Sequence, residues 1–550
     1  MAKGSARARV AALVKRLAPG GSAAEHAEAA HTLGRLCFDK GPIREYARRC
    51  GGVAALVGLL APGGTDAVHM HAAAALRSLC LDNAQNQDGV RECGGVAALV
   101  RLLAPGGPAA VQQRAAGALS DLCRQNGQNR DSVRECGGIA ALVRLLAPGG
   151  PAAVQCEAAG ALARLCMENA RNQDSARECG GAAALVGLLE PGGLPAVHEA
   201  AVAALQRLCW DSMQNSDSVR ECGGVAALVG LLAPGRSAGV QKRAALALGN
   251  LFIKNTRNQD RGREGGGAAA LVALLAPSRS AGVQDRAAIA LGNLCFEGIG
   301  NKNSVRECGG VAALVGLLAP GGSAALHAHA ARALRNLCSG NAHNSNSVRE
   351  CGGVAALVGL LAPGSSAAVR EQAAAALLEL CSVSAQSRDA ECGGVAALVG
   401  LLAPARPAAV HEHAAAALVN LTGECERCRE AVRACGGVAA LERMRACADS
   451  ATARRGRRRR CATWRTSSKQ GKEGQAEAGT LYGRVGAAAV AAAVATAVVP
   501  HSLVVLRTPG WPFVGASICC HAVRKHHTVA CTSQRHASPG RAVWMGAPSA

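Results

Sequence analysis

A pair of adjacent glycines, followed by an apolar run, recurs along most of the chain at a nearly constant spacing. Successive pairs are 43 residues apart, except for one interval of 41 residues between Gly352 and Gly393. The segment from Val10 to Gly21 is the same unit in truncated form, so the repeat covers roughly residues 8 to 446 of 550. A fixed period of this length indicates a stacked-repeat architecture. The pairs begin at Gly51, Gly94, Gly137, Gly180, Gly223, Gly266, Gly309, Gly352, Gly393 and Gly436.

Each unit is predicted to contain three helices. In the unit around the Gly223 pair, residues 215–222 contain Asn, Ser and Asp, which cap helix starts, and end at the Gly-Gly break. Residues 225–233 follow with apolar side chains at i, i+3, i+4 and i+7, the spacing of one helical face, and Pro234 stops this helix. Residues 238–252 form the third and longest helix. A short, a medium and a long helix in 43 residues predict an all-α solenoid.

Other repeat classes fit less well. Ankyrin and tetratricopeptide repeats have periods of about 33 and 34 residues, and leucine-rich repeats contain a strand motif that is absent from this sequence. HEAT repeats share the period range, but they use two helices and lack the Gly-Gly break. Apolar residues make up 49% of the chain and aromatic residues only 2%, so Leu, Val and Ala must form the core. Because one repeat cannot bury its apolar face alone, neighbouring repeats must stack.

Residues 303–338, NSVRECGGVAALVGLLAPGGSAALHAHAARALRNLC, carry a resemblance to a known family. The Gly pair, the A-L-V-x-L-L core and the A-L-x-N-L ending resemble the armadillo repeat. The resemblance implies a right-handed superhelical solenoid whose third helices line a concave face, and a non-enzymatic scaffold that binds proteins or extended peptides there. We expect an N-terminal capping repeat in residues 1–50, the armadillo solenoid in residues 51–446 and a basic tail in residues 447–550.

The resemblance also indicates candidate binding residues. In nuclear-import members of the family, the third helix carries a Trp and, four residues later, an Asn that binds a peptide backbone. Here the Trp position is never Trp, which departs from that type of groove. The Asn position predicts binding of an extended or acidic segment, and the alternative is that these side chains only cap or hydrate the helix surface. The candidates are Asn250, Asn293, Asn336 and Asn420, with Arg164 and Arg207 at the same position of other repeats.

Seventeen of the 25 cysteines occupy two repeat positions, where we expect them to be buried packing residues. The absence of a disulfide pattern predicts a reducing compartment, the cytoplasm or the nucleus. One position ends the first helix, at Cys50, Cys93, Cys136, Cys179, Cys222, Cys308, Cys351, Cys392 and Cys435. The other ends the third helix, at Cys37, Cys80, Cys123, Cys166, Cys209, Cys295, Cys338 and Cys381.

The sequence contains no motif for a catalytic nucleophile, a phosphate-binding loop or a zinc protease, so no enzyme activity and no cofactor are expected. The Cys425 and Cys428 pair lacks a second C-x-x-C, so no metal site is predicted. Histidines near the start of the third helices, such as His69 and His198, align with Gln112 and Gln155 and are predicted to be solvent-exposed.

The tail differs from the repeats in composition and charge. From Arg443 onward there are 17 Lys or Arg and only 3 Asp or Glu. An arginine patch suggests nuclear import or, as the alternative function, association with nucleic acid, whereas a solvated disordered charge run explains it equally well. The Ala/Val-rich segment 485–499 is short for a membrane span, and the basic N-terminus is already in repeat register, so no signal peptide is expected. The patch consists of Arg454, Arg455, Arg457, Arg458, Arg459 and Arg460.

Overall fold

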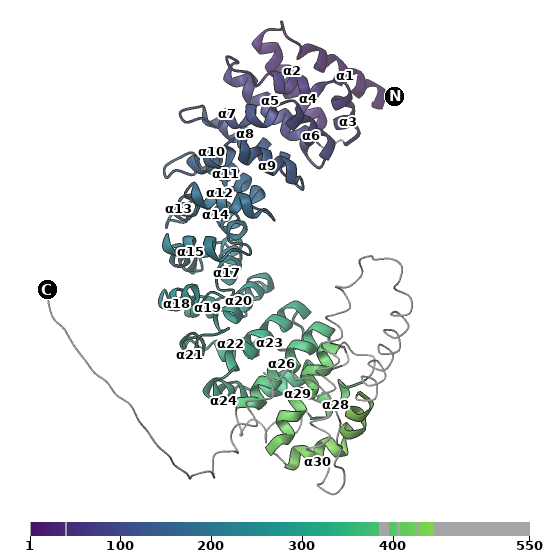
Figure 1. The fold of residues 1–550 in the computed structure, drawn as a ribbon, viewed down its shortest axis with the longest axis vertical. Helices are drawn as coiled ribbons and strands as arrows, with labels where there is room; N and C mark the ends of the chain where they lie inside the picture. The colour runs from purple at the N-terminus through teal and green to yellow at the C-terminus, as the bar shows by residue number, and fades with distance from the viewer. Residues whose placement is uncertain are drawn as a thin grey trace, which may run out of the picture. The chain divides into compact units, whose positions relative to one another are not determined.

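The computed structural model describes residues 2–38, 41–362, 364–383, 395–403, 408–424 and 426–444, all within one compact unit, Met1–Val499. In these ranges the chain forms α-helices joined by turns and contains no strand (Figure 1). The predicted all-α fold is therefore confirmed. None of these helices is long and apolar enough to cross a membrane. The arginine patch and the Ala/Val-rich segment lie outside the described residues.

The helices recur in the predicted order of first, second and third helix. The first helices are α3 (Gly41–Arg49), α6 (Ala84–Glu92), α9 (Gly127–Glu135), α12 (Ala170–Glu178), α15 (Met213–Glu221), α18 (Thr256–Glu264), α21 (Ile299–Glu307), α24 (Ala342–Glu350) and α30 (Glu426–Ala434). The second helices are α4 (Gly52–Gly58), α7 (Gly95–Arg101), α10 (Gly138–Arg144), α13 (Gly181–Gly187), α16 (Gly224–Gly230), α19 (Gly267–Ala273), α22 (Gly310–Gly316), α25 (Gly353–Gly359) and α28 (Val395–Gly400). The third helices are α2 (Ala23–Cys37), α5 (Asp66–Cys80), α8 (Ala109–Leu122), α11 (Ala152–Leu165), α14 (Pro195–Leu208), α17 (Ala238–Leu251), α20 (Ala281–Leu294), α23 (Ala324–Cys338), α26 (Ala367–Val383) and α29 (Ala408–Glu424). The truncated unit supplies α1 (Ala2–Arg16), which packs against α2 and α3.

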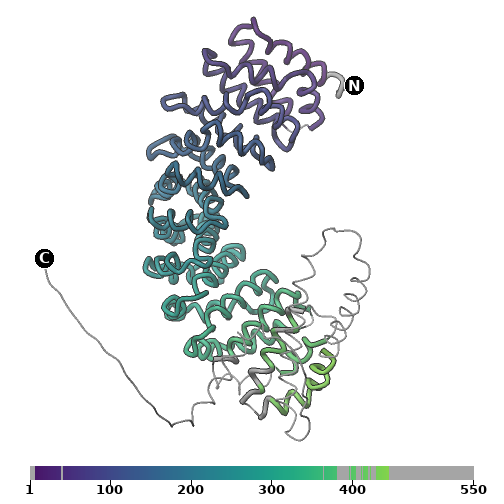
Figure 2. The backbone as a smooth tube through the Cα atoms, viewed as in Figure 1, coloured from purple at the N-terminus to yellow at the C-terminus, as the bar shows by residue number. Residues whose placement is uncertain are grey.

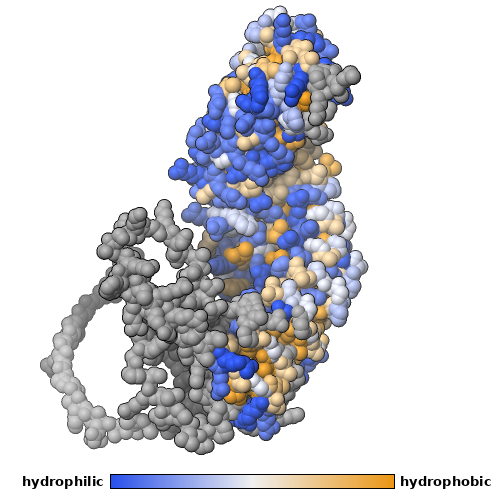
Figure 3. Space-filling view, turned by 90° about the vertical axis from the view of Figure 1, so that its right-hand side faces the viewer, coloured by the Kyte–Doolittle hydropathy of each residue, from blue (hydrophilic) through white to orange (hydrophobic). Residues whose placement is uncertain are grey.

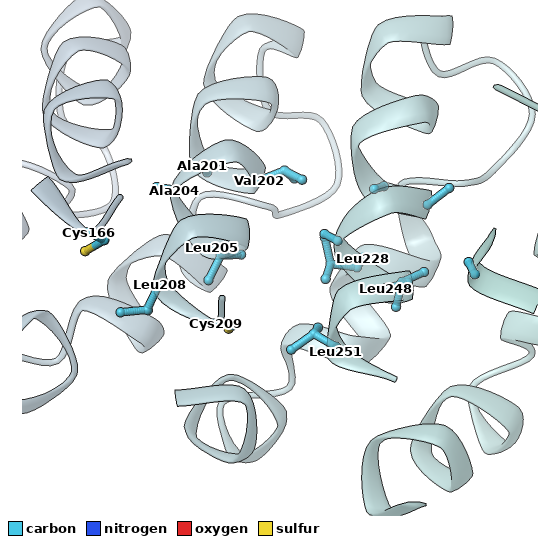
Figure 4. Close-up of a cluster of buried hydrophobic side chains, with 14 of the residues drawn as sticks. Cys166, Ala201, Val202, Ala204, Leu205, Leu208, Cys209, Leu228, Leu248 and Leu251 are labelled. Carbon is cyan, nitrogen blue, oxygen red and sulfur yellow. The ribbon is translucent and has the colours of Figure 1, made fainter. Parts of the chain in front are cut away.

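Third helices form the continuous element of the stack. From α2 to α29, each packs against the third helix of the next repeat and against the second helix of its own repeat (Figure 2). The core between them consists of Leu, Val, Ala and Cys, and Figure 4 shows leucines of α14, α16 and α17 in one such layer. Because every layer buries its apolar face on its neighbours, the repeats form a solenoid.

Both glycines of each pair have a structural role. Gly223 adopts φ 79°, a left-handed conformation that costs glycine little, and it ends α15 where α16 begins. Gly224 allows close packing, since a Cβ atom there would lie 2.5 Å from Cγ1 and 2.8 Å from the carbonyl oxygen of Val219. The sequence predicted the first role, but only the structure shows the second.

Two predicted helix boundaries are wrong. The first helix starts at Met213 rather than at residue 215, and its N-cap is Ser212, whose side chain accepts from the Asn215 N–H. The second helix ends at Gly230 rather than at residue 233. Beyond Gly230 the chain forms i→i+3 bonds, such as Leu232 N–H to Val229 O at 3.0 Å, which tighten the last turn before the proline is reached.

Asn215 is therefore not a cap for its own helix. Its side chain is fully buried, and Nδ2 donates to the Leu208 carbonyl of the preceding α14 at 2.9 Å. Asn258 makes the same bond to Leu251. The next residue of the first helix binds the third helix of its own repeat, because Gln173 Nε2 of α12 donates to the Arg207 and Trp210 carbonyls at the end of α14. These side chains bind carbonyl groups at third-helix ends, which have no partner within the helix.

Candidate functional site

The residues selected from the sequence lie in the last turn of successive third helices. Asn250, Asn293 and Asn336 occupy α17, α20 and α23, while Arg164 and Arg207 occupy α11 and α14. Since these helices pack against one another in that order, their polar side chains belong to one surface, which we call the third-helix face. Asn420 belongs to α29, and its side chain is outside the described residues.

The three asparagines are not equivalent. Asn293 Nδ2 donates to the Gly249 carbonyl of α17 at 2.8 Å, and Asn336 Nδ2 donates to the Gly292 carbonyl of α20 at 2.8 Å. Both carbonyls lie in the last turn of their helices, so each asparagine caps the third helix of the preceding repeat. Asn250 is half-buried, and its side chain forms no hydrogen bond with a described residue. The capping role that the sequence left open is thus present at Asn293 and Asn336.

The arginines at the same position also differ from each other. Arg164 Nε donates to the Ser120 hydroxyl of α8 at 3.1 Å. Burial and the nearby Arg124 lower the pKa of Arg164, so its positive charge is held in an unfavourable environment. Arg207 is exposed and forms no ion pair with a described residue.

The third helices α5, α8 and α11 contain three Arg and three Asp or Glu, a net charge of zero. Arg77 forms two ion pairs, whereas Arg114 and Arg164 form none with a described residue. Arg77 Nε of α5 lies 2.8 Å from Asp121 Oδ2 of α8, and Arg77 Nη1 lies 2.9 Å from Glu157 Oε1 of α11. Burial alone would lower the pKa of Arg77, but the bonds to Glu157 and Asp121 raise it. The arginine reaches two repeats along the stack because Gly117 lies between, where a Cβ atom would be 2.6 Å from Arg77 Nη1. Nothing in the sequence pattern indicated this pairing of residues 80 positions apart.

Across α17, α20 and α23 the charges are only partly neutralised. The three helices contain five Lys or Arg and one Asp, a net charge of +4. The single acid is Asp285. Its Oδ2 lies 3.7 Å from Arg286 Nε, and its Oδ1 lies 2.6 Å from His329 Nδ1. Three cations form no ion pair with a described residue, namely Lys242, Arg332 and Arg335.

Arg332 carries the clearest sign of an unsatisfied cation. Burial and the neighbouring Arg335 lower its pKa. Its Nε is buried and has no hydrogen-bond partner in the described part of the chain. A buried donor without a partner costs about 1–3 kcal/mol, so an anion that reached this guanidinium would bind favourably.

The prediction that the histidine and glutamine position is exposed is wrong. Only 1% of His198 and 9% of His69 is exposed, and Gln112 and Gln155 are also buried. His198 Nε2 lies 3.2 Å from the Glu190 carbonyl oxygen, eight residues earlier, and Gln112 Nε2 donates to the Ala104 carbonyl at 2.8 Å. Both side chains satisfy a carbonyl group that follows the second helix, which explains why the two residue types alternate.

One of the two predicted cysteine positions is also wrong. The third-helix cysteines from Cys37 to Cys338 are buried as expected, and Cys381 lies outside the residues whose side chains are described. Burial raises the pKa of Cys209 to about 12. First-helix cysteines follow the last helical residue at the Gly-Gly turn, where the apolar core does not reach. Cys50 is half-buried, and the exposed members are Cys93, Cys136, Cys179, Cys222, Cys308, Cys351 and Cys435.

Comparisons with known proteins agree with this architecture. The Armadillo/beta-catenin-like repeat family matches residues 83–124, 128–167, 212–253, 299–339 and 341–382, each running from a first to a third helix. The crystal structure of an engineered protein is 31% identical and superposes with a TM-score of 0.69, covering 75% of this chain and 98% of that one. A second engineered protein is 30% identical with a TM-score of 0.42, covering 44% and 96%. No curated protein matches the chain.

Armadillo repeats generally form scaffolds that bind proteins or peptides, and their solenoid is typically non-enzymatic. The chain has the period and the three-helix unit of these repeats. It also matches the family's repeat, and it covers almost all of an engineered structure on which it superposes. The chain belongs to the armadillo-repeat family.

Proposed function

We propose that this protein is a non-enzymatic scaffold whose third-helix face, from α14 to α23, binds an extended acidic segment of a partner protein. The observation that carries the proposal is the set of cations on α17 and α23 without acidic partners, Lys242, Arg332 and Arg335. On α5 the equivalent arginine is neutralised within the protein. A net charge of +4 on α17, α20 and α23, against zero on α5, α8 and α11, marks the part of the repeated surface that receives an external anion.

The acidic character of the partner follows from electrostatics. Arg332 and Arg335 are three residues apart on one helix, and their mutual repulsion contributes to the lowered pKa of Arg332. A partner carboxylate would remove that repulsion and would bind a guanidinium through two parallel hydrogen bonds. Complementary charge of this kind raises both association rate and specificity.

The extended shape of the partner follows from the amides. Asn250, Asn293 and Asn336 recur once per repeat, and amide oxygens can accept from the backbone N–H groups of an extended chain. Asn293 uses Nδ2 within the solenoid, so Oδ1 is the atom it offers. Asn336 is buried, and its Oδ1 accepts from Arg335 Nε at 3.3 Å. Asn250, without an internal bond, can both donate and accept.

Fluorescence anisotropy of the full chain with labelled peptides tests the proposal. One peptide of about twelve residues has Asp and Glu alternating with Ser, and a second has Lys in place of every acid. We expect only the acidic peptide to bind, and Arg332→Gln with Arg335→Gln to weaken it about tenfold, or 1.4 kcal/mol. Arg101→Gln with Arg144→Gln, at exposed positions on second helices, is the matched control and should change affinity less than twofold.

Equal losses from both pairs of substitutions would show that binding depends only on net charge, and the proposal would fail. A single-stranded oligonucleotide of the same charge is the necessary competitor, since nucleic acid is also anionic. The third helices α17, α20 and α23 contain no Phe, Tyr or Trp, so base stacking would have to use Trp210 or Phe296, which are exposed in the loops after α14 and α20. Tighter binding of the oligonucleotide through Arg332 and Arg335 would overturn the choice of a protein partner.

A further inference from the structure

Large apolar side chains are exposed in the loops that join a third helix to the next first helix. Trp210 is 54% exposed, Ile253 53% and Phe296 45%. Met213 and Ile299, the first residues of α15 and α21, are 61% exposed. These five residues lie in or at the ends of three consecutive loops, and we call them the apolar edge. The space-filling view shows that hydrophobic residues reach the surface in patches among hydrophilic ones (Figure 3).

The placement of the aromatic residues is not what core packing would produce. The chain has only ten aromatic residues, and five of them fall in the described part. Phe252 is buried and Tyr46 packs against the core. The other three, Phe38, Trp210 and Phe296, are exposed at the same repeat position, directly after the core residue that ends the third helix. A contiguous exposed apolar patch marks an interaction site, and aromatic residues dominate binding energy at such sites.

The backbone conformation of the loops fixes the exposure of Trp210 and Ile253. After Trp210 and Ile253, Asp211 and Lys254 adopt φ 56° and 49°, a left-handed conformation that reverses the chain. The buried amide of Asn215 then holds the start of α15 against the Leu208 carbonyl of α14. At Trp210 and Ile253, the residue between helix end and reversal is therefore directed away from the core by the turn itself, which preorganises this part of the apolar edge.

The apolar edge borders the third-helix face. Ile253 N–H donates to the Asn250 carbonyl at 3.2 Å, and Phe296 N–H donates to the Asn293 carbonyl at 3.3 Å. Trp210 follows Arg207 by the same three residues. Each repeat from α14 to α20 thus has one large apolar residue three positions after one Asn or Arg of the proposed binding face.

We infer that the apolar edge and the third-helix face bind one partner segment, an extended acidic sequence with a large apolar residue at every third position. The inference rests on the proposed function and specifies its ligand. Packed helices lie 8–10 Å apart, and an extended polyproline-II chain rises 3.1 Å per residue with three residues per turn. Residues i, i+3 and i+6 therefore share one side at a spacing of roughly 9 Å, which matches one apolar residue per repeat.

The charge of the third-helix face favours binding of a segment of another protein over binding of this protein's own tail. The residues from 443 onward contain 17 Lys or Arg and 3 Asp or Glu, and a basic segment would be repelled by helices of net charge +4. An acidic segment is attracted to the same helices while its apolar residues cover Trp210, Ile253 and Phe296. The occupant is thus a segment of another protein.

The test compares three labelled peptides on the full chain. The first is the acidic Ser-containing peptide, and the second has Leu at every third position with Asp or Glu between. The third has the same composition, with its Leu residues moved to alternate positions in one part of the peptide. We expect the second peptide to bind about tenfold more tightly than either of the others. Trp210→Ser with Phe296→Ser should remove that gain and leave the binding of the Ser-containing peptide unchanged.

Leu194→Ser, at a residue 58% exposed away from the apolar edge, is the control and should leave all three affinities unchanged. If Trp210→Ser with Phe296→Ser still binds the second peptide as tightly, or if the second and third peptides bind equally, the inference is wrong while the proposed function stands. Failure of all three peptides to bind would reject the proposed function itself. Sedimentation showing a dimer that these substitutions dissociate would identify a second copy of the chain as the occupant and overturn the inference.

Discussion

The third helices α5–α11 and α17–α23 are built on the same pattern but treat charge differently. In α5–α11, Arg77 is neutralised by Asp121 and Glu157, and the three third helices have a net charge of zero. In α17–α23, Arg335 occupies the same helix position as Arg77, yet it forms no ion pair with a described residue. The comparison shows that repeats with the same helical packing can differ in whether the charges on their third helices are paired.

Thiol reactivity tests whether the two regions share the same core. Burial raises the pKa of Cys123 after α8 and of Cys295 after α20 from 9.0 to about 12. Because the thiolate is the reactive form, we expect alkylation of native protein at pH 8 to be at least about 100-fold slower there than at exposed Cys136 and Cys308. Mass spectrometry of iodoacetamide-treated protein measures the rates. Fast labelling of Cys295 but not of Cys123 would show that the regions differ in packing as well as in charge.

Removal of the two equivalent arginines tests the difference in charge directly. Arg77→Met leaves Asp121, whose side chain is only 9% exposed, without its cation. Breaking a buried pair costs about 3–5 kcal/mol, and the partial exposure of Arg77 reduces the expected loss of unfolding free energy to about 2 kcal/mol. Arg335→Met should change stability by less than about 0.5 kcal/mol. Urea unfolding followed by circular dichroism measures both, and equal losses would contradict the comparison.

The fold was predictable from the sequence because it depends on a period. The Gly-Gly pairs and the apolar spacing around Leu228 recur often enough to define the three helices. The ion pairs of Arg77 were not predictable, since they join residues in different repeats whose alignment depends on how the helices stack. Cys136 and Cys209 both recur at a fixed position of the repeat, so the sequence does not distinguish them. In the structure Cys209 is buried in the core, whereas Cys136 lies outside it and is exposed. His198 was misjudged because its backbone partner lies beyond the helix that carries it.

The asparagines of α17 and α20 allow a finer test within the charged region. Asn293→Ala removes the donor to the Gly249 carbonyl, a net loss of about 1 kcal/mol that the higher helix propensity of Ala partly offsets. Asn250→Ala loses no internal bond with a described residue and should gain about 0.5 kcal/mol from propensity alone. We therefore expect the two variants to differ by about 1 kcal/mol in thermal or urea unfolding. Equal stabilities would mean that the Asn293 bond contributes nothing to packing.

Two glycines at one helix position give the smallest and most specific test. A Cβ atom at Gly117 would lie 2.6 Å from Arg77 Nη1 and 3.1 Å from Glu157 Oε2, whereas one at Gly160 would meet nothing within 4 Å. Gly160→Ala should therefore stabilise the protein by about 0.5–1 kcal/mol through helix propensity. Gly117→Ala should give no gain, because the same propensity is offset by displacing Arg77 from Glu157.

The Arg77→Met background separates these two contributions. With the guanidinium removed, Gly117→Ala should stabilise the protein as much as Gly160→Ala does, and urea unfolding of the four variants completes a double-mutant cycle. A coupling energy near zero would show that Gly117 is not what allows Arg77 to reach Glu157. A coupling of about 1 kcal/mol would establish that Gly117 in α8 permits the ion pair between Arg77 and Glu157. In α17 and α20, where the proposed partner binds, the same position holds the bulkier residues Leu246 and Ile289.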